Sequence, residues 1–341
     1  DFGTILRTTN GGTNWVSQTS GTTAWLYGVC FTDANTGTAV GDYGAILRTT
    51  NGGATWVNQM SGTIAELYGV SFTDANTGTA VGDQGTILRT TNGGATWLNQ
   101  TSGTTAWLCG VSFTDANTGT AVGKAGTILR TTDGGLSWLP QTSGTDWTLF
   151  GVSFTDANTG TAVGQSGTIL RTTDGGANWT EQTSGTINNF WAVSFTDANT
   201  GTAVGDNGAI LRTTNGGATW VKQISGTTTS LHDVSFTDAN TGTVVGRNGT
   251  ILRTTNGGLK WLGQASGTIY NLYGVSFADA NTGTVVGSPN TILRTTNGGA
   301  TWVSQNGSRV QGLYAVSCTD ASTATAVGWY GTILRGTASG N

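Results

Sequence analysis

One unit of 41 residues repeats along the whole chain, and this repeat restricts the possible folds more than any other feature. Its clearest marker is a tryptophan at positions 15, 56, 97, 138, 179, 220, 261 and 302, with no insertion or deletion between copies. Eight such units account for nearly all of the 341 residues. A period of this length is typical of folds in which similar supersecondary units bury their apolar faces against their neighbours.

Each unit contains four short runs with β character. In the copy that begins at Leu67 they are LYGVSF (67–72), TAVG (79–82), TILRTT (86–91) and TWLNQ (96–100). Valine, isoleucine, threonine and aromatic residues dominate the runs, and turn-forming glycine, asparagine, aspartate and serine separate them. A four-stranded meander at this period is typical of a β-propeller blade. A linear β-solenoid is the alternative, but its repeats are usually shorter.

The number of copies of each strand predicts how the ring closes. The ILR of the third strand occurs nine times, and every other strand occurs eight times. We therefore expect an all-β, eight-bladed propeller of four-stranded blades over residues 1–341, closed by a blade that combines residues 1–20 with 313–335. Residues 4–8 and 332–335 then compete for one third-strand position. The surplus strand is either a frayed end or, by exchange between chains, a link that joins propellers into a filament.

The segment after the third strand resembles a known motif. The pattern Thr49-x-Asn51-x-Gly53-x-Thr55-Trp56 is similar to the Asp-box of BNR-repeat propellers. The whole unit resembles the photosystem II stability/assembly factor family and its secreted bacterial relatives. This resemblance implies that the box joins the third and fourth strands and that its tryptophan packs between blades. Asparagine replaces the box aspartate in six units and can make the same turn hydrogen bond. The structural box residues include Asn51, Trp56, Asp133, Trp138, Asp174 and Trp179.

A comparison of the units with one another shows where the sequence varies. They differ mainly between the outer strand and the next inner strand, and in the turn between the second and third strands. Alternate turns of an antiparallel meander lie at the same end, so both segments should lie on one face of the ring. Loops on a rigid scaffold often bind ligands, and exposed aromatic rings suit sugars or peptides. Drift on a face without a ligand is the alternative. The candidate binding residues are Trp25, Tyr43, Glu66, Trp107, Lys124, Trp147, Trp191, His232, Arg247, Tyr270, Trp329 and Tyr330.

The composition argues against several functions. Charged residues make up 9% of the chain and the net charge is −4, whereas nucleic-acid binding needs clustered lysine and arginine. No apolar run approaches the roughly 20 residues of a membrane helix, so we expect no direct membrane insertion. The cysteines Cys30, Cys109 and Cys318 lack metal-ligand spacing, and the chain has one histidine. We therefore expect no metal and no cofactor.

Asp-boxes also occur in sialidases, so a glycosidase has to be considered. Glycosidases generally use two carboxylates that flank one bond, and glutamate occurs only as Glu66 and Glu181. Asp33 and Arg48 recur in every unit. A catalytic residue should be unique in its surroundings, so we expect these repeated residues to pair with each other or to cap turns. The sequence thus predicts a protein that is not an enzyme.

Together these features predict a binding or adhesion propeller outside the cell or on its surface, with the periplasm as the alternative location. Its ligand is expected to be a glycan or a protein bound on the varying face. One alternative is a structural subunit of a surface filament built from copies of the chain. A second alternative, which rests on the family resemblance, is an assembly factor for a membrane protein complex.

Overall fold

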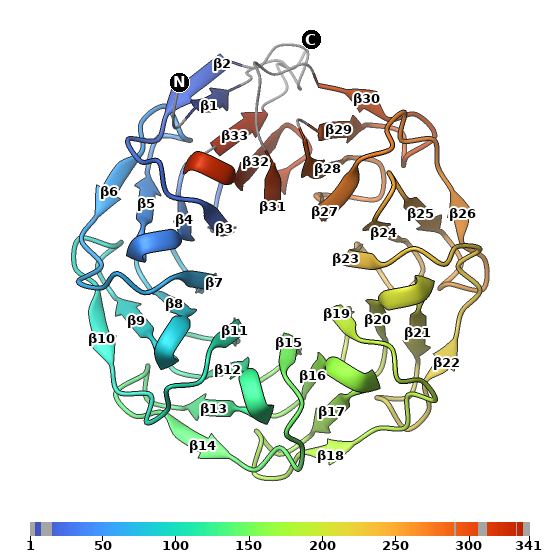
Figure 1. Cartoon of the computed structure of the whole chain (residues 1–341), viewed down its shortest axis with the longest axis horizontal. Coiled ribbons are helices and arrows are strands. Elements are labelled where there is room, and N and C mark those ends of the chain that lie inside the picture. The colour runs from blue at the N-terminus through green and yellow to red at the C-terminus, as the bar shows by residue number, and fades with distance from the viewer. Residues whose placement is uncertain (1–3, 8–15, 290, 306–311, 332, 337–341) are drawn as a thin grey trace.

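The chain forms a ring of β-sheets around a central axis (Figure 1). The computed structural model describes residues 4–7, 16–289, 291–305, 312–331 and 333–336. In each meander the first strand lies nearest the axis and the fourth lies at the rim. Within the described residues, no helix has both the length and the apolar character needed to cross a membrane.

The strands fall into four concentric sets. The inner strands are β3 (Leu26–Phe31), β7 (Leu67–Phe72), β11 (Leu108–Phe113), β15 (Leu149–Phe154), β19 (Phe190–Phe195), β23 (Leu231–Phe236), β27 (Asn271–Phe277) and β31 (Leu313–Asp320). The second strands are β4 (Gly37–Gly41), β8 (Gly78–Gly82), β12 (Gly119–Gly123), β16 (Gly160–Gly164), β20 (Gly201–Gly205), β24 (Gly242–Gly246), β28 (Gly283–Ser288) and β32 (Thr323–Gly328). The third strands are β1 (Thr4–Arg7), β5 (Ile46–Thr49), β9 (Ile87–Thr90), β13 (Ile128–Thr131), β17 (Ile169–Thr172), β21 (Ile210–Thr213), β25 (Ile251–Thr254), β29 (Thr291–Thr295) and β33 (Ile333–Gly336). The outer strands are β2 (Val16–Thr19), β6 (Val57–Gln59), β10 (Leu98–Gln100), β14 (Leu139–Gln141), β18 (Thr180–Glu181), β22 (Val221–Lys222), β26 (Leu262–Gly263) and β30 (Val303–Ser304).

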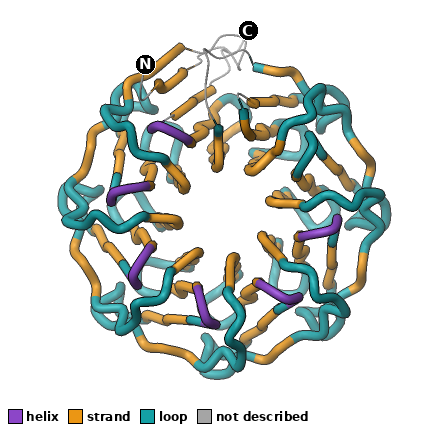
Figure 2. The backbone as a smooth tube through the Cα atoms, in the orientation of Figure 1, coloured by secondary structure: helices purple, strands orange, loops and turns teal. Residues whose placement is uncertain are grey.

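Short 3-10 turns connect most second strands to third strands. Figure 2 shows them in purple, arranged around the ring. They are η1 (Asp42–Gly44), η2 (Asp83–Gly85), η3 (Lys124–Gly126), η4 (Gln165–Gly167), η5 (Asp206–Gly208) and η6 (Trp329–Gly331). The four-strand order within a unit therefore agrees with the sequence analysis.

The closing sheet differs from the other blades. Seven sheets have four strands, whereas this sheet has five, in the order β2-β1-β33-β32-β31. The prediction of eight four-stranded blades was therefore wrong, and the two copies of the third strand do not compete for one position. β33 pairs antiparallel with β32, and β1 lies parallel to β33, with Ile5 opposite Ile333 and Arg7 opposite Arg335. In the described part of the chain, β33 has no outer strand directly after it, so its free edge can accept β1.

The hydrophobic core lies between neighbouring sheets. In the first blade, Leu26, Ala39, Leu47 and Trp56 pack in one cluster with Val327 of β32. Every residue of β4 is buried, because neighbouring sheets cover both of its faces. The box tryptophan packs between blades, as the resemblance implied.

The repeated arginine connects each blade to the next. Nη1 of Arg48 donates to Oγ1 of Thr38 at 2.7 Å within its own blade, and Nη2 donates to the carbonyl oxygen of Ala75 in the next blade. Cζ of Arg48 also lies 4.9 Å from the centroid of the Phe72 ring, again in the next blade. The same contacts recur at Arg89, Arg130, Arg171, Arg212 and Arg253. The repetition of this arginine thus has a structural cause.

The repeated aspartate and the box asparagine stabilise turns. Oδ1 of Asp115 accepts hydrogen bonds from the backbone N–H groups of Asn117 at 2.7 Å and Thr118 at 3.0 Å, and these bonds lower the pKa of Asp115. In the Asp-box, Oδ1 of Asn51 accepts from the N–H of Thr55 at 3.0 Å. Asparagine therefore makes the turn bond expected of aspartate, and the repeated aspartate caps a turn.

Candidate binding face

The two varying segments of each unit lie side by side on one face of the ring. The backbone N–H of Asp42, in the turn between the second and third strands, donates to the carbonyl oxygen of Trp25 at 2.8 Å. The equivalent bond joins Lys124 to Trp107 at 2.8 Å. On the opposite face, the backbone N–H of Gly52 in the box turn donates to the carbonyl oxygen of Asn35 at 2.8 Å. The turns with freely varying sequence and the turns with repeated sequence therefore occupy opposite faces.

Among the described residues, the turn after seven of the eight second strands holds a non-glycine residue in a left-handed conformation. In the first blade Tyr43 has φ 53° and ψ 31°, Gly44 has φ 68°, and the N–H of Ala45 donates to the carbonyl oxygen of Asp42 at 2.9 Å. Such a turn prefers asparagine followed by glycine. A bulky residue at this φ is strained, and strain of this kind is concentrated at functional sites. The Tyr43 side chain is 77% exposed.

Eight side chains form a collar where the inner strands begin, on the same face. Each inner strand has a register shift around its second residue, or around its third in β27, and a β-bulge redirects the side chain at such a position. All eight side chains are half-buried. The collar residues are Tyr27, Tyr68, Cys109, Phe150, Trp191, His232, Tyr273 and Tyr314.

Five collar residues make a continuous arc of ring contacts. The centroid distances are 5.2 Å for His232 and Tyr273, 5.6 Å for Tyr273 and Tyr314, 5.6 Å for Tyr314 and Tyr27, and 5.7 Å for Tyr27 and Tyr68. The arc crosses strands from five sheets, so it exists only in the closed ring.

A second pair of collar rings lies elsewhere on the collar. Phe150 and Trp191 stack with their centroids 4.6 Å apart. Cys109 stands between the arc and this pair in chain order, and it is a free cysteine whose pKa is raised by burial to about 11. Burial also raises the pKa values of the free Cys30 and Cys318.

Sequence reasoning named only Trp191 and His232 among the collar residues. The others were missed because the run LYGVSF was interpreted as scaffold. The available signal was the variation at its second position, where the units carry five different residue types while the neighbouring leucine and valine barely change. The bulge at this position became visible only in the paired strands.

Carboxylates lie against one end of the arc. Burial raises the pKa of Tyr27, and its hydrogen bond to Asp42 adds to this effect. Oη of Tyr68 donates to Oε2 of Glu66 at 2.8 Å. Burial also raises the pKa values of Asp42 and Asp83, and repulsion by Glu66 contributes to both. Among the described residues, Oδ1 of Asp42 and Oδ1 of Asp83 are buried atoms that have no hydrogen-bond partner. The negative charge at this end of the arc is therefore poorly compensated.

Another carboxylate on this face is well compensated by hydrogen bonds. Oδ1 of Asp206 accepts from Nε1 of Trp191 at 2.9 Å and from Oγ of Ser230 at 2.8 Å, and Oδ2 accepts from Nδ2 of Asn189 at 3.0 Å. Asp206 therefore fixes the orientation of the Trp191 indole.

Cationic groups also lie on the varying face. Nζ of Lys124 lies 4.9 Å from the centroid of the Trp107 ring. Nδ1 of His232 is 3.0 Å from the carbonyl oxygen of Leu272. Burial lowers the pKa of His232, and the nearby charge of Arg247 lowers it further.

The remaining predicted residues are spread around the face and do not form one site. Trp25 stacks on Trp329, with centroids 5.3 Å apart and planes at 12°, and Tyr330 meets Trp25 edge-on at 6.2 Å. Trp147 and Tyr270 are 53% and 46% exposed, and their carbonyl oxygens accept hydrogen bonds from the turn of the preceding blade. Within the described residues, no group of three or more His, Cys, Asp or Glu side chains is arranged to hold a metal ion.

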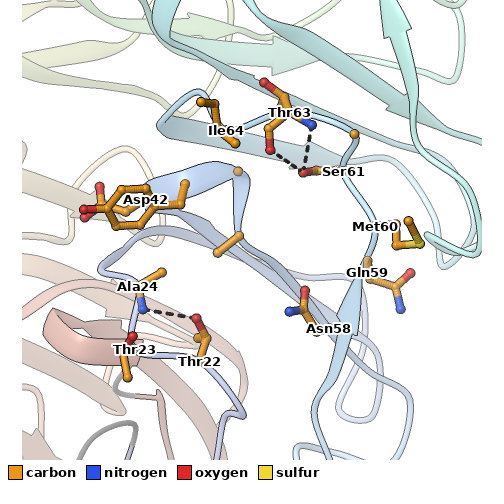
Figure 3. A pocket seen from close by; sticks show the side chains of 14 residues that line it. Thr22, Thr23, Ala24, Asp42, Asn58, Gln59, Met60, Ser61, Thr63 and Ile64 are labelled. Atoms are coloured by element: carbon orange, nitrogen blue, oxygen red, sulfur yellow. Dashed lines mark hydrogen bonds between the residues drawn. The ribbon is translucent and has the colours of Figure 1, made fainter.

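Shallow hollows recur between blades on the outer part of this face. One hollow of about 850 Å³ lies between the turn that contains Tyr43 and the segment that contains Met60 and Ile64 (Figure 3). Oγ of Ser61 donates to the carbonyl oxygen of Thr63 at 3.2 Å and shapes its wall. Similar hollows occur at other blade junctions. Because they recur with the repeat, they follow from blade geometry and do not mark a single site.

These observations define a class of protein: a β-propeller of Asp-box repeats whose varying segments gather on one face. The model of the family described as photosynthesis system II assembly factor YCF48 matches residues 58–139, 98–181, 140–225 and 221–341. These matches together span most of the chain. The chain therefore belongs to this family.

Solved structures with the same fold include members of this family. YCF48 from Cyanidioschyzon merolae is 21% identical, with a TM-score of 0.64 over 81% of this chain and 96% of that one. A structure of YCF48 bound to a D1 peptide is 20% identical, with a TM-score of 0.63 over 81% of this chain and 90% of that one. The computationally designed protein Ika8 is 15% identical, with a TM-score of 0.79 over 98% of this chain and all (100%) of that one. At these identities the likeness concerns the fold. No match was found among curated protein sequences.

Proposed function

We propose that this chain is a non-catalytic, protein-binding propeller that holds a segment of a partner protein on its varying face, as an assembly factor does. The observation that carries the proposal is the gathering of half-buried and exposed aromatic side chains on the one face where the units differ. Aromatic residues are enriched at protein interfaces because a single ring supplies a large contact area with few rotatable bonds.

The family gives further support for a protein ligand. Its model is named after an assembly factor, and one of the solved YCF48 structures is described as bound to a D1 peptide. From that relative we take the kind of ligand, a peptide, and not its identity. An assembly role thus accounts better for this chain than adhesion through a glycan, which was the first prediction from the sequence.

The non-catalytic part of the proposal rests on the roles of the acidic and basic groups. The repeated Asp115 and Arg130 already have structural partners in turns and between blades. Glu66 lies at the start of an inner strand, whereas Glu181 lies on the outer strand of a different blade. Self-assembly into a filament and a location outside the cytoplasm stay predictions.

The proposal can be tested by selecting random 12-residue peptides displayed on phage against the immobilised propeller. We expect enriched peptides whose affinity, measured by fluorescence anisotropy, falls about 30-fold in the double variant Trp107→Ser and Trp147→Ser, because exposed tryptophans often dominate binding energy. The matched control is Leu98→Ser with Leu139→Ser, since these leucines are 63% and 64% exposed but lie on outer strands.

Two results would contradict the proposal. One is a selection that enriches no peptide. The other is a set of peptides that bind both double variants as tightly as the original protein. Binding in a glycan array that is lost with Trp107→Ser would instead favour the carbohydrate ligand.

A further inference from the structure

We propose that the end of the collar formed by Tyr27, Tyr68, Asp42, Glu66 and Asp83, here called the tyrosine–carboxylate cluster, binds an arginine side chain of the partner peptide. The inference rests on the proposed function and deepens it by naming the residue type that the face selects.

Tyr27 and Tyr68 form a pair of adjacent aromatic rings in neighbouring blades. Both occupy bulge positions in β3 and β7, their centroids are 5.7 Å apart, and their planes are tilted by 44°. Both side chains are half-buried, so their rings are held by neighbours and remain partly accessible. Rings held in this way can stack against a planar cation at little entropic cost.

The second argument is a comparison between blades. In the third blade, Lys124 lies over Trp107 at 4.9 Å, so the chain itself supplies a cation to an aromatic ring of this face. In the first blade, the two equivalent positions are Trp25 and Asp42, joined by the same backbone bond of 2.8 Å. The ring is kept, but the charge beside it is reversed. Among the described residues no cation takes the place of Lys124 beside Asp42, so a cation there would come from a partner.

The third argument is the balance of charge. Burial raises the pKa values of Asp42 and Asp83, and repulsion by the Glu66 carboxylate adds to both. Within the described residues, Lys124 lowers the pKa of Asp83, and no cation lowers that of Asp42. A bound cation would relieve the repulsion.

Arginine fits the cluster better than lysine does. A guanidinium group is planar, stacks on aromatic faces and donates two parallel hydrogen bonds to a carboxylate. The cluster offers both surfaces together, because Glu66 bonds to the hydroxyl group of Tyr68 at 2.8 Å and so lies beside its ring. A lysine ammonium group would use the charge but not the planar fit.

The probe for a direct test is a fluorescein-labelled Gly/Ser peptide of 12 residues with three spaced arginines. Matched peptides carry citrulline, lysine or glutamate at the same positions. Citrulline keeps the shape of arginine but carries no charge. With the full chain at low salt, we expect the arginine peptide to bind about tenfold more tightly than the citrulline peptide.

Two variants should remove this preference. Glu66→Gln changes an exposed side chain and should leave folding intact, and Tyr68→Leu removes one ring. Each should bring the arginine peptide to within about threefold of the citrulline peptide. The matched controls are Glu181→Gln, which makes the same change of net charge at the rim, and Phe150→Leu, which removes a collar ring from the separate pair. Both controls should keep the preference, and thermal unfolding by circular dichroism checks every variant.

The inference is overturned if the arginine and citrulline peptides bind equally, or if Glu181→Gln weakens binding as much as Glu66→Gln does. Equal binding of the lysine and arginine peptides overturns the preference for arginine. If phage-selected peptides bind the tryptophan face but ignore Glu66→Gln and Tyr68→Leu, the proposed function stands and this inference fails. If no peptide binds to the face at all, both fail.

Discussion

Replacement of Asp233 by alanine should change the pH dependence of stability by an amount that the structure predicts. Asp233 lies on β23 where five other blades have glycine: Gly28, Gly69, Gly110, Gly151 and Gly274. Its Oδ1 accepts from the N–H of Val234 at 2.8 Å, and its Oδ2 accepts from the N–H of Val275 in the next blade at 2.9 Å. Burial raises the pKa of Asp233 from 3.8 to about 6, although the two hydrogen bonds act in the opposite direction.

The sign follows from proton binding. The folded state binds this proton more tightly than the unfolded state, so the stabilisation is complete below pH 3.8 and is lost as the pH rises through about 6. A shift of about two pH units at about 1.4 kcal/mol per unit corresponds to about 3 kcal/mol. The two hydrogen bonds favour the ionised carboxylate, and the pKa of about 6 already includes their effect, so this pKa shift sets the difference between two pH values.

Urea unfolding followed by circular dichroism measures the effect. The free energy of unfolding of Asp233→Ala minus that of the original protein should increase by about 3 kcal/mol between about pH 3.5 and about pH 7.5. The matched variant Gly151→Asp places the same group at the equivalent position, where an added Cβ has contacts no closer than 3.4 Å, and should show the opposite trend. A difference that stays constant with pH would refute the argument.

Two further pairs of substitutions test the contacts between blades and the strained turn. Arg130→Met removes a hydrogen bond within its own blade and both the hydrogen bond and the ring contact to the next blade. The free energy of unfolding in urea should therefore fall by about 2–4 kcal/mol. The control Arg247→Met on the varying face should change it by less than about 0.5 kcal/mol. Tyr43→Asn should stabilise the chain by about 1 kcal/mol because asparagine tolerates the left-handed conformation, and Asn207→Tyr should destabilise it by a similar amount. Thermal unfolding tests Tyr43→Asn and Asn207→Tyr. If Tyr43→Asn has the same melting temperature as the original protein, Tyr43 is not strained.

Much of the fold could be predicted from residues that are close together in the sequence. The runs 67–72, 79–82, 86–91 and 96–100 match the four strands of their blade to within a few residues, and the Gly, Asn and Asp residues between them form the turns. The face on which the copies differ also followed from the sequence, because strand direction alternates and each turn therefore has a defined end of the sheet. A repeated residue such as Arg130 could be recognised as structural from the sequence. Its partners in the next blade, a carbonyl oxygen and an aromatic ring, could not be predicted.

The repeat by itself therefore determined the blade, its strand order and the location of sequence variation, since these depend on the period and on turn chemistry. Only the tertiary structure decided what depends on contacts between distant segments. The ILR runs of β1 and β33 are identical, so the sequence did not show that both enter the same sheet. In the structure β1 pairs with the edge of β33 in a five-stranded sheet. The collar likewise required the closed ring, because Tyr27 lies at a bulge in β3 and contacts the rings of Tyr68 and Tyr314 in the two neighbouring blades.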